Sequence, residues 1–343
     1  MFGNIPERNF YYDETKPSNL KLDWDSDTHG SYSNTSFIAY DSLIIISDLS
    51  GRITALNYLT GKKVGEIKYD GEIEQTAVIK KNFLIFIVNN LKENYSTLVA
   101  YDVKNGKEIK TKKLLGKFNN ELLLIDDFVI AVSDFGRVYK ISNLTTIEWE
   151  IDLEREIHSN PAADKNNIFI SSVSGDFIKI SVADGKVLYD NKISESFQSG
   201  ISIDSKFAYL GDVNGVFYSL VKADGSVNWE FDSETKILQT PGLDGKNIYF
   251  GNLRGDLYSL NKSSGKMNWV TETKGLINAS PLIFNNIIIQ PNLFRKVDVI
   301  NKYNGEIVNQ IEFEKRCRAT PIYYRDRIFI GVDKGEIFCY TFE

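Results

Sequence analysis

Histidine and cysteine, which commonly act as general bases, nucleophiles or metal ligands, are rare in this chain. It contains two histidines, His29 and His158, and two cysteines, Cys317 and Cys339. Because the histidines are distant in sequence, neither a histidine-rich metal site nor a histidine-based catalytic triad is indicated. The cysteines fall near strands that are not neighbours, too far apart for a disulfide, so we expect two free thiols.

One short motif is superficially similar to a calcium-binding loop. Asp212, Val213, Asn214 and Gly215 begin like one, but the later acidic ligands of such a loop are missing. A β-turn that contains Asn-Gly explains the same residues. No glycine-rich phosphate loop lies between a strand pattern and a helix pattern. The sequence therefore predicts no catalytic residue, no metal ligand and no cofactor-binding residue.

The overall composition is that of a globular protein with ample material for a core. Apolar residues make up 42% of the chain and aromatic residues 13%, while the formal net charge is −6. We find no basic stripe, so nucleic acid is not an expected partner. Residues 1–30 contain no apolar run that resembles a signal peptide, and no stretch is long enough to span a membrane. The protein is therefore either cytoplasmic or a mature form whose targeting segment was removed.

The elements that position these residues come from an internal repeat of about 40 residues, which occurs eight times. Most units contain a glycine in a short polar loop, followed by a strand pattern. These glycines are Gly51, Gly136, Gly175, Gly215, Gly255 and Gly335, and Ser96 and Arg295 take their place in two units. An apolar or aromatic residue follows five positions later in every unit: Leu56, Tyr101, Ile141, Ile180, Leu220, Leu260, Ile300 and Tyr340.

Within one unit, residues 238–269, four short strand patterns rich in β-branched and aromatic residues are separated by turns, and helical periodicity is absent. Four antiparallel strands at this period are typical of a propeller blade. The sequence therefore predicts an all-β, eight-bladed β-propeller. The last unit lacks its fourth strand, which residues 19–24 would supply by pairing with residues 336–342, so that no open edge is left.

The repeat also sets the domain boundaries. We expect residues 1–18 to form a loosely ordered N-terminal tail and residues 19–343 to form a single propeller domain. The opening strands are expected near Phe37, Ala77, Glu121, Pro161, Gly200, Pro241, Pro281 and Pro321. An insertion at residues 89–95 falls between the second and third strands of the second blade, where either a tolerated surface insertion or a functional loop is possible.

Two columns of residues are expected near the mouth of the central channel. The residue before each opening strand is small and polar: Ser36, Thr76, Asn120, Asn160, Ser199, Thr240, Ser280 and Thr320. These side chains either satisfy backbone groups at the turn or line a polar funnel that accepts a ligand. Two positions earlier lies a variable column, which we predict to contact a protein partner: Asn34, Glu74, Phe118, His158, Phe197, Leu238, Asn278 and Arg318. Its apolar members Phe118, Phe197 and Leu238 either form an exposed patch or pack beneath their loops.

All four tryptophans occupy one register of the fourth strand. That register contains Trp24, Gly65, Lys110, Trp149, Tyr189, Trp229, Trp269 and Asn309. In complete cases the tryptophan follows a turn glycine by four residues, as in Gly225 and Trp229. This spacing, the period and the eight-fold count resemble the tryptophan-docking repeat of pyrroloquinoline-quinone-type propellers over residues 20–342. The resemblance implies that each tryptophan packs between neighbouring blades instead of binding a ligand.

The enzymes of that superfamily, the quinoprotein dehydrogenases, carry a disulfide between adjacent cysteines, a catalytic aspartate and a calcium site. This chain has no adjacent cysteines and few long loops. It looks more like the BamB-type propellers of the outer-membrane β-barrel assembly machinery. That resemblance implies a non-enzymatic scaffold without cofactor, facing the periplasm, with any signal or lipid anchor outside this sequence.

We expect a monomer whose protein partners include assembly proteins. One expected recognition mode is the pairing of a partner's extended segment with an exposed outer strand. Three alternatives stay open: a quinoprotein-type enzyme, a small-ligand sensor domain that binds in the central polar funnel, and a cytoplasmic location.

Overall fold

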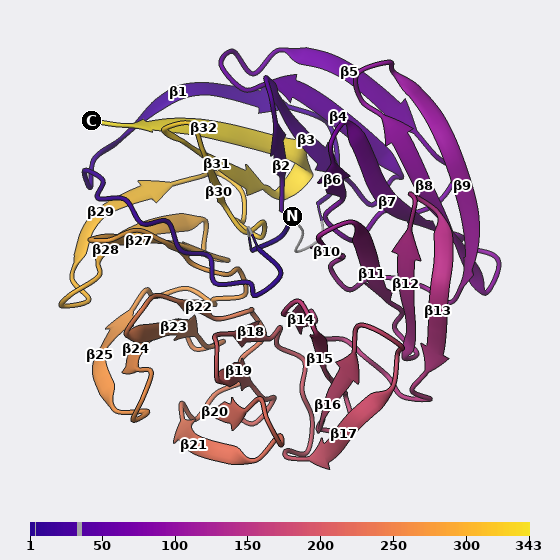
Figure 1. Cartoon of the computed structure of the whole chain (residues 1–343). Coiled ribbons are helices and arrows are strands. Elements are labelled where there is room, and N and C mark those ends of the chain that lie inside the picture. The colour runs from indigo at the N-terminus through magenta and orange to yellow at the C-terminus, as the bar shows by residue number, and fades with distance from the viewer. Residues whose placement is uncertain (4, 33–35) are drawn as a thin grey trace.

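The computed structural model describes residues 1–3, 5–32 and 36–343, and these form eight antiparallel sheets of four strands each. The sheets are arranged as blades around a central axis (Figure 1). The predicted all-β, eight-bladed β-propeller is therefore confirmed.

In each blade the strands run in order from the axis outward, and each neighbouring pair is antiparallel. Blades 1 to 4 contain β2 (Ile38–Tyr40), β3 (Leu43–Ser47), β4 (Arg52–Asn57), β5 (Lys63–Lys68), β6 (Val78–Lys80), β7 (Phe83–Asn89), β8 (Tyr95–Asp102), β9 (Lys107–Leu115), β10 (Leu123–Ile125), β11 (Phe128–Val132), β12 (Arg137–Ser142), β13 (Thr146–Asp152), β14 (Ala162–Ala163), β15 (Asn167–Ser171), β16 (Asp176–Ser181) and β17 (Val187–Lys192).

Blades 5 to 8 follow the same plan. They contain β18 (Ser202–Ile203), β19 (Phe207–Gly211), β20 (Val216–Val221), β21 (Val227–Asp232), β22 (Gly242–Leu243), β23 (Asn247–Gly251), β24 (Asp256–Asn261), β25 (Met267–Glu272), β26 (Leu282–Ile283), β27 (Ile287–Asn292), β28 (Lys296–Asn301), β29 (Ile307–Glu312), β30 (Ile322–Tyr324), β31 (Arg327–Val332), β32 (Glu336–Phe342) and β1 (Leu20–Asp27). A 3₁₀ turn, η1 (Asp333–Gly335), joins β31 to β32. Across the described ranges, no helix has the length and apolar character that crossing a bilayer requires.

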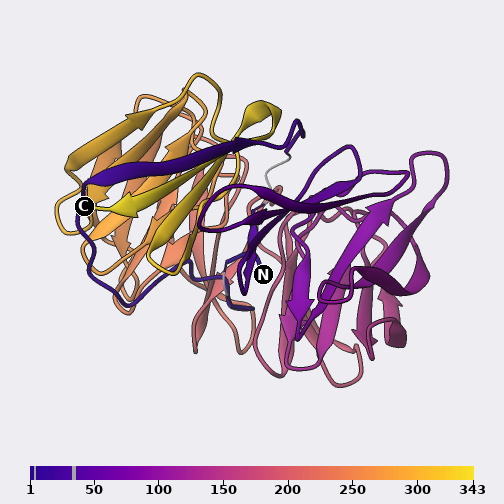
Figure 2. The same ribbon diagram turned by 90° about the horizontal axis from the view of Figure 1, so that it is seen from above.

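The two ends of the chain meet in blade 8. β1 pairs with β32, which places Leu20 opposite Phe342 and Trp24 opposite Cys339. The indigo β1 lies beside the yellow β32 in Figure 1, and the turned view in Figure 2 shows the same pairing. Closure of the last blade by the N-terminal strand is therefore confirmed, and the ring has no gap at this point.

The connections divide the ring into two faces. One face carries both the loops between the second and third strands and the connections between blades, and we call it the upper face. These two kinds of loop are tied together: Leu253 N donates to Lys236 O at 2.9 Å. The upper-face loop of blade 6 turns at Gly255, whose φ is +100° and where an added Cβ would lie 2.7 Å from Gly275 O. Only glycine fits this turn without strain, which explains why the repeat is marked by glycine.

The tryptophans dock each blade onto the next one. Trp269 Nε1 donates to Lys302 O at 3.0 Å, and the indole lies against Gly305, where a Cβ would come within 2.8 Å of the ring. Trp24, Trp149 and Trp229 make the equivalent bond to the following blade. A turn glycine in each following blade leaves room for the indole. The tryptophans are therefore inter-blade packing residues, as the sequence predicted.

The N-terminal segment, residues 5–14, differs from the loosely ordered tail that we expected. It crosses the lower ends of the inner strands of blades 4 to 7, where Ala163, Ile203 and Leu243 donate their backbone N–H to carbonyls of the segment at 2.9–3.1 Å. Both views place the N-terminus at the centre of the ring (Figures 1 and 2). Inner strands present unpaired backbone groups to the channel, and the segment satisfies some of them. It therefore covers part of the lower end of the channel.

Candidate functional site

A ring of polar residues surrounds the channel at the upper ends of the inner strands. Ser36 N donates to Thr76 Oγ1 at 2.8 Å, and Thr76 N donates to Glu121 Oε2 at 2.8 Å. In the same way Glu121 N donates to Asn160 Oδ1 at 3.0 Å. In this part of the ring, the side chain of one blade satisfies the backbone of the preceding blade. This matches the first of the two roles considered for these residues.

Two members of the ring differ from the sequence prediction by one residue. The ring residue precedes its inner strand by two positions, as Thr240 precedes β22. By this rule Glu121 and Gly200 occupy the ring, in place of the expected Asn120 and Ser199, and the opening strands of blades 3 and 5 shift likewise. At Gly200 an added Cβ would lie 2.0 Å from Thr240 Oγ1, so the neighbouring hydroxyl fills the space that a side chain would need.

Glu121 brings a carboxyl group into a buried position. Its two oxygens accept hydrogen bonds from the backbone and hydroxyl of Thr76 at 2.8 and 2.9 Å. Burial raises the pKa of Glu121 to about 7, and the charge of Arg8 opposes that shift. A buried carboxyl group is costly unless it is hydrogen-bonded and lies near an opposite charge, and both conditions are met here.

Arg8 is supplied by the N-terminal segment and is itself fully buried. Its guanidinium donates to Phe2 O and Glu121 O at 3.1 Å each, and also to Pro161 O. Burial lowers the pKa of Arg8 to about 10, and Glu121 opposes that shift. This pair was not predicted from the sequence, because residues 1–18 were expected to form a loosely ordered tail.

A cavity of about 360 Å³ lies at the upper mouth of the channel. Its walls are mainly amide, hydroxyl and carboxyl side chains, and Phe2 of the N-terminal segment also lines it. The cavity is lined by Phe2, Glu74, Asn119, Asn120, Glu121, Asp134, His158, Asn160, Gln198, Leu238, Gln239, Thr240, Asn278, Ser280 and Thr320. We call this polar cavity the cup. A second cavity of about 240 Å³ lies beside the N-terminal segment, against inner strands of blades 1, 2, 7 and 8, and shares Thr320 with the cup.

The predicted variable column partly coincides with the wall of this cup. Glu74, His158, Leu238 and Asn278 line the cavity. Arg318 is not in its wall, and its guanidinium forms an ion pair with Asp333 at 3.0 Å. Asn34 lies outside the described residues. Their role in binding a partner stays a prediction.

Phe118 and Phe197 do not form the exposed apolar patch considered for this column. Both are fully buried beneath their loops, where Phe118 packs on Tyr139 and Phe197 on Tyr218, with ring centroids 5.9 and 5.7 Å apart.

The one-residue shift explains this placement too, because Asn119 and Gln198 take the cavity-lining positions in these two blades. The signal that could have set the register is a buried apolar residue three positions before the ring residue. Aligning Phe118 and Phe197 with the buried Ile73 and Ile157 sets the register correctly.

The tips of the upper-face loops form a second variable column. In seven of these loops the turn contains a glycine, or Arg295, with positive φ. We define the loop tip as the residue directly before it: Ser50, Phe135, Ser174, Asn214, Arg254, Phe294 and Lys334. Phe135 and Phe294 are both 59% exposed. Arg295 has a φ of +65° and replaces the glycine after Phe294. Large exposed aromatic side chains on rigid loops are typical of protein-binding surfaces.

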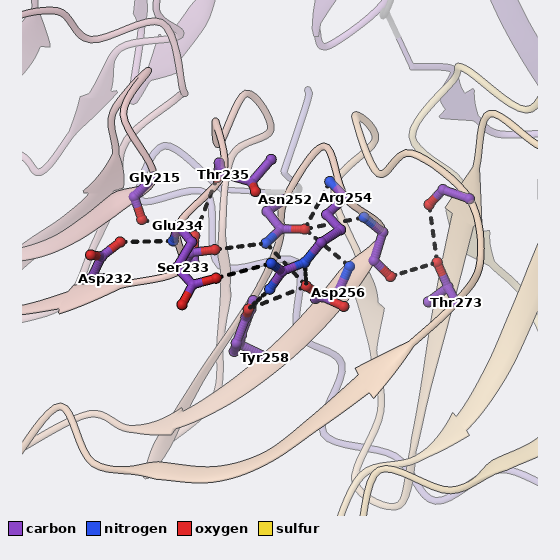
Figure 3. Close-up of polar contacts among 12 residues, drawn as sticks. Gly215, Asp232, Ser233, Glu234, Thr235, Asn252, Arg254, Asp256, Tyr258 and Thr273 are labelled. Carbon is purple, nitrogen blue, oxygen red and sulfur yellow. Dashed lines mark hydrogen bonds and ion pairs between the residues drawn. The ribbon is translucent and has the colours of Figure 1, made fainter.

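Figure 3 shows how firmly one loop tip is held. Asn252 Oδ1 accepts hydrogen bonds from the backbone N–H groups of Arg254, Gly255 and Asp256 at 3.0–3.1 Å. The guanidinium of Arg254 contacts Asp256 Oδ2 at 2.5 Å and Glu234 Oε2 at 3.0 Å. In blade 5, Asp212 caps its own turn in the same way, accepting from Asn214 N at 2.9 Å. The resemblance of that loop to a calcium site is therefore explained by turn formation.

The eight blades, the docked tryptophans and the glycine loops define a propeller of the pyrroloquinoline-quinone type. A family model described as outer membrane protein assembly factor BamB matches residues 18–146, 134–279 and 213–337. The chain belongs to this family. None of the curated proteins compared with it matches.

Several solved structures share the fold at low sequence identity. BamB from Moraxella catarrhalis is 14% identical, with a TM-score of 0.79, covering 94% of this chain and 100% of that one. The computationally designed Ika8 protein is 13% identical, with a TM-score of 0.80, covering 91% and 97%. Quinohemoprotein alcohol dehydrogenase from Comamonas testosteroni is 10% identical, with a TM-score of 0.80, covering 99% of this chain and 79% of that one.

The residues present do not fit the quinone and calcium site that the enzymes of this superfamily would imply. Cys317 and Cys339 are buried, unpaired and not adjacent, and burial raises the pKa of both thiols. Among the residues that the structure describes, no group of three histidine, cysteine or acidic side chains is placed to hold a metal ion. The carboxyl group of Glu121, which lines the cup, is engaged by Thr76.

Proposed function

We propose that this protein is a non-catalytic interaction scaffold, a BamB-like accessory factor for the assembly of β-barrel proteins, located at the periplasmic face of the outer membrane. One observation carries the proposal. A rigid ring presents variable tips on its upper face, and two of these tips are phenylalanines that are 59% exposed. The family match supports the same role, because the family is described as an assembly factor.

The partner would be a protein that covers the upper face. Phe135 and Phe294, in blades 3 and 7, supply apolar anchors on opposite sides of the ring, and Arg254 supplies a charged group held in one orientation. Glu74, His158, Leu238, Asn278 and Arg318 complete the predicted contact surface, and Asn34 belongs to the same column. Such a surface, with few apolar anchors in a polar surround, suits a specific protein contact.

Site-specific photocrosslinking in bacteria tests this assignment. A photoreactive phenylalanine analogue replaces Phe135 or Phe294, and as a control it replaces Leu59, an exposed residue on the lower face. We expect the two upper-face positions to form adducts that mass spectrometry identifies as components of the β-barrel assembly machinery. Adducts to such components from Leu59 alone, or from none of the three positions, would contradict the proposal.

A quinoprotein-type enzyme is the competing function, because a dehydrogenase shares this fold and because a polar cup lies on the axis. Adding pyrroloquinoline quinone and calcium to the purified protein separates the two functions. We expect no bound quinone absorbance after gel filtration. A redox-active chromophore that stays with the protein would overturn the scaffold proposal.

A further inference from the structure

The outer strand of blade 2, β9, is unlike the other outer strands. It has nine residues, and every side chain except Leu114 is exposed. In β17, β21 and β29, by contrast, half-buried residues alternate with exposed ones from the third position onward. β9 ends its sheet, so its outer backbone edge is unpaired as well. It forms part of the rim of the ring in Figure 1. Both of its faces and one edge are therefore open to solvent.

Three features of the sequence accompany this exposure. Lys110 occupies the register that carries tryptophan in four other blades, and it lies opposite Ala100 as Trp269 lies opposite Ser259. The turn that would receive an indole, in blade 3, has no glycine, and Leu144 packs into the core there with a φ of +75°. The insertion lies between β7 and β8, as predicted, and these strands and β9 are longer than their counterparts in most blades.

The charge on β9 is also exceptional. It carries four lysines and one acidic residue, Glu108, whose carboxylate accepts a hydrogen bond from Tyr69 at 3.1 Å. The ion pairs of the described residues include none of these lysines, which are Lys107, Lys110, Lys112 and Lys113. Each other outer strand has at most one lysine or arginine without an ion pair. The neighbouring outer strand, β13, carries three carboxylates and no basic residue. A local basic strand therefore exists, although the sequence analysis found none in a chain of net charge −6.

We propose that the free edge of β9 binds an acidic, extended segment of a partner protein, which adds to blade 2 as a fifth strand. The edge supplies unpaired backbone N–H and C=O groups, and the lysines supply complementary charge. Ile109 and Leu115 are 36% and 45% exposed on the same strand and provide apolar contacts. This inference rests on the proposed role in protein binding and names the chemistry of one partner segment.

Protection against aggregation is the competing explanation, because lysines on an edge strand discourage edge-to-edge pairing. The other seven outer strands also end their sheets, and none of them carries several unpaired lysines. Protection against aggregation alone therefore does not require four lysines on one strand. An anionic membrane surface would match the charge but would leave the backbone groups of the edge without partners.

Peptide binding tests the inference directly. The probe is a fluorescein-labelled, capped peptide of four Glu-Val repeats, followed by fluorescence anisotropy at low salt. We expect saturable binding that weakens with added salt, and a loss of roughly tenfold or more in the variant Lys107→Glu, Lys110→Glu, Lys112→Glu. A control variant with the same charge change elsewhere, Lys62→Glu, Lys68→Glu, Lys266→Glu, should bind the peptide as the wild type does.

A second peptide, N-methylated at alternate residues, separates strand addition from charge attraction. We expect it to bind at least about tenfold more weakly, because it cannot form the ladder of backbone hydrogen bonds. Equal binding of both peptides, equal loss in both charge variants, or a preference for phosphatidylglycerol vesicles over the peptide would overturn the inference. Neither peptide tests the upper face, so this experiment and the crosslinking experiment fail independently.

Discussion

Blades 4 to 7 and blades 1 to 3 are built from the same repeat but are held together differently. In the first group the ring residues Asn160, Gly200, Thr240 and Ser280 follow one another at steps of 40 residues, whereas Thr76 and Glu121 are 45 apart and Glu121 and Asn160 are 39 apart. Most interfaces of the regular group have two repeated contacts, a docked aromatic side chain and a lysine–aspartate pair between adjacent blades, such as Lys262 with Asp204 at 3.1 Å.

Blades 1 and 2 lack the docked aromatic side chain. Gly65 occupies its register in blade 1, and the turn glycine of blade 2, Gly106, has only the hydroxyl of Tyr101 near it, 3.9 Å from where a Cβ would be. The comparison shows that buried core side chains pack blades 1 and 2 against the blade that follows each of them without a docked aromatic ring. The outer strand of blade 2 has no aromatic side chain docked onto blade 3, so it is available for a different role.

The largest expected effect comes from breaking a docking contact in the regular group. Replacing Trp269 by alanine removes a side chain that is 9% exposed and leaves a cavity against Gly305, which should cost about 3–5 kcal/mol. Lys110→Ala, in the same register of blade 2, should change stability by no more than about 0.5 kcal/mol. Urea unfolding followed by tryptophan fluorescence and circular dichroism measures both. Similar losses in the two variants would remove the distinction between the groups.

A smaller effect should appear in the pH dependence of stability. Folding raises the pKa of Glu121 from 4.5 to about 7, so the folded protein binds more protons than the unfolded chain between these values. The stability contributed by Glu121 is therefore present below about pH 4.5 and is lost as pH rises through about 7. The unfolding free energy of the wild type minus that of Glu121→Gln should therefore fall by about 1–3 kcal/mol over that pH range.

Urea unfolding of both proteins at a series of pH values measures this difference. Thr240, a ring residue of the regular group, has no group that ionises in the same range, so Thr240→Val serves as a control with a pH-independent effect. A difference between wild type and Glu121→Gln that stays constant or rises with pH would show that Glu121 is not a buried, proton-binding group.

The smallest effect is a gain. Gly65→Trp should place an indole over the open space at Gly106 and stabilise the protein by about 0.5–2 kcal/mol. Gly65→Ala is the control, since it removes the strand glycine without adding a ring. Thermal unfolding should rank Gly65→Trp above Gly65→Ala. A tryptophan variant no more stable than the alanine variant would mean that the interface between blades 1 and 2 has no vacant docking site.

The parts of the fold that were predictable are those that repeat. The tryptophan register recurs with fixed spacing, and counting the repeats identifies the closing strand as the missing fourth strand of the last unit. Both are found where the sequence places them. The ring residues of blades 3 and 5 were misplaced because the count runs through connections whose length varies. The apolar residues Phe118 and Phe197 carried the correct register, and their burial is the second of the two alternatives that the sequence left open.

The partnership of Arg8 with the ring could not be predicted from local pattern. Its acceptors include Pro161 O, which is 153 residues away in sequence, and backbone carbonyls leave no signature in a sequence. The charge of β9 was visible in the residues, but its significance depends on the fact that none of its lysines forms an ion pair, which only the tertiary structure reveals. The candidate binding surface was therefore predictable as a face, and less so as a set of side chains.

The N-terminal segment and β1 also set an order for folding. Both emerge from the ribosome before the strands that they contact, since residues 5–14 lie on the inner strands of blades 4 to 7 and β1 pairs with β32. Contacts of such long sequence separation slow folding. Until their partner strands are synthesised, the apolar side chains of residues 5–14 and β1 stay exposed to solvent. Stopping translation after blade 7 should therefore leave β1 unpaired and sensitive to protease.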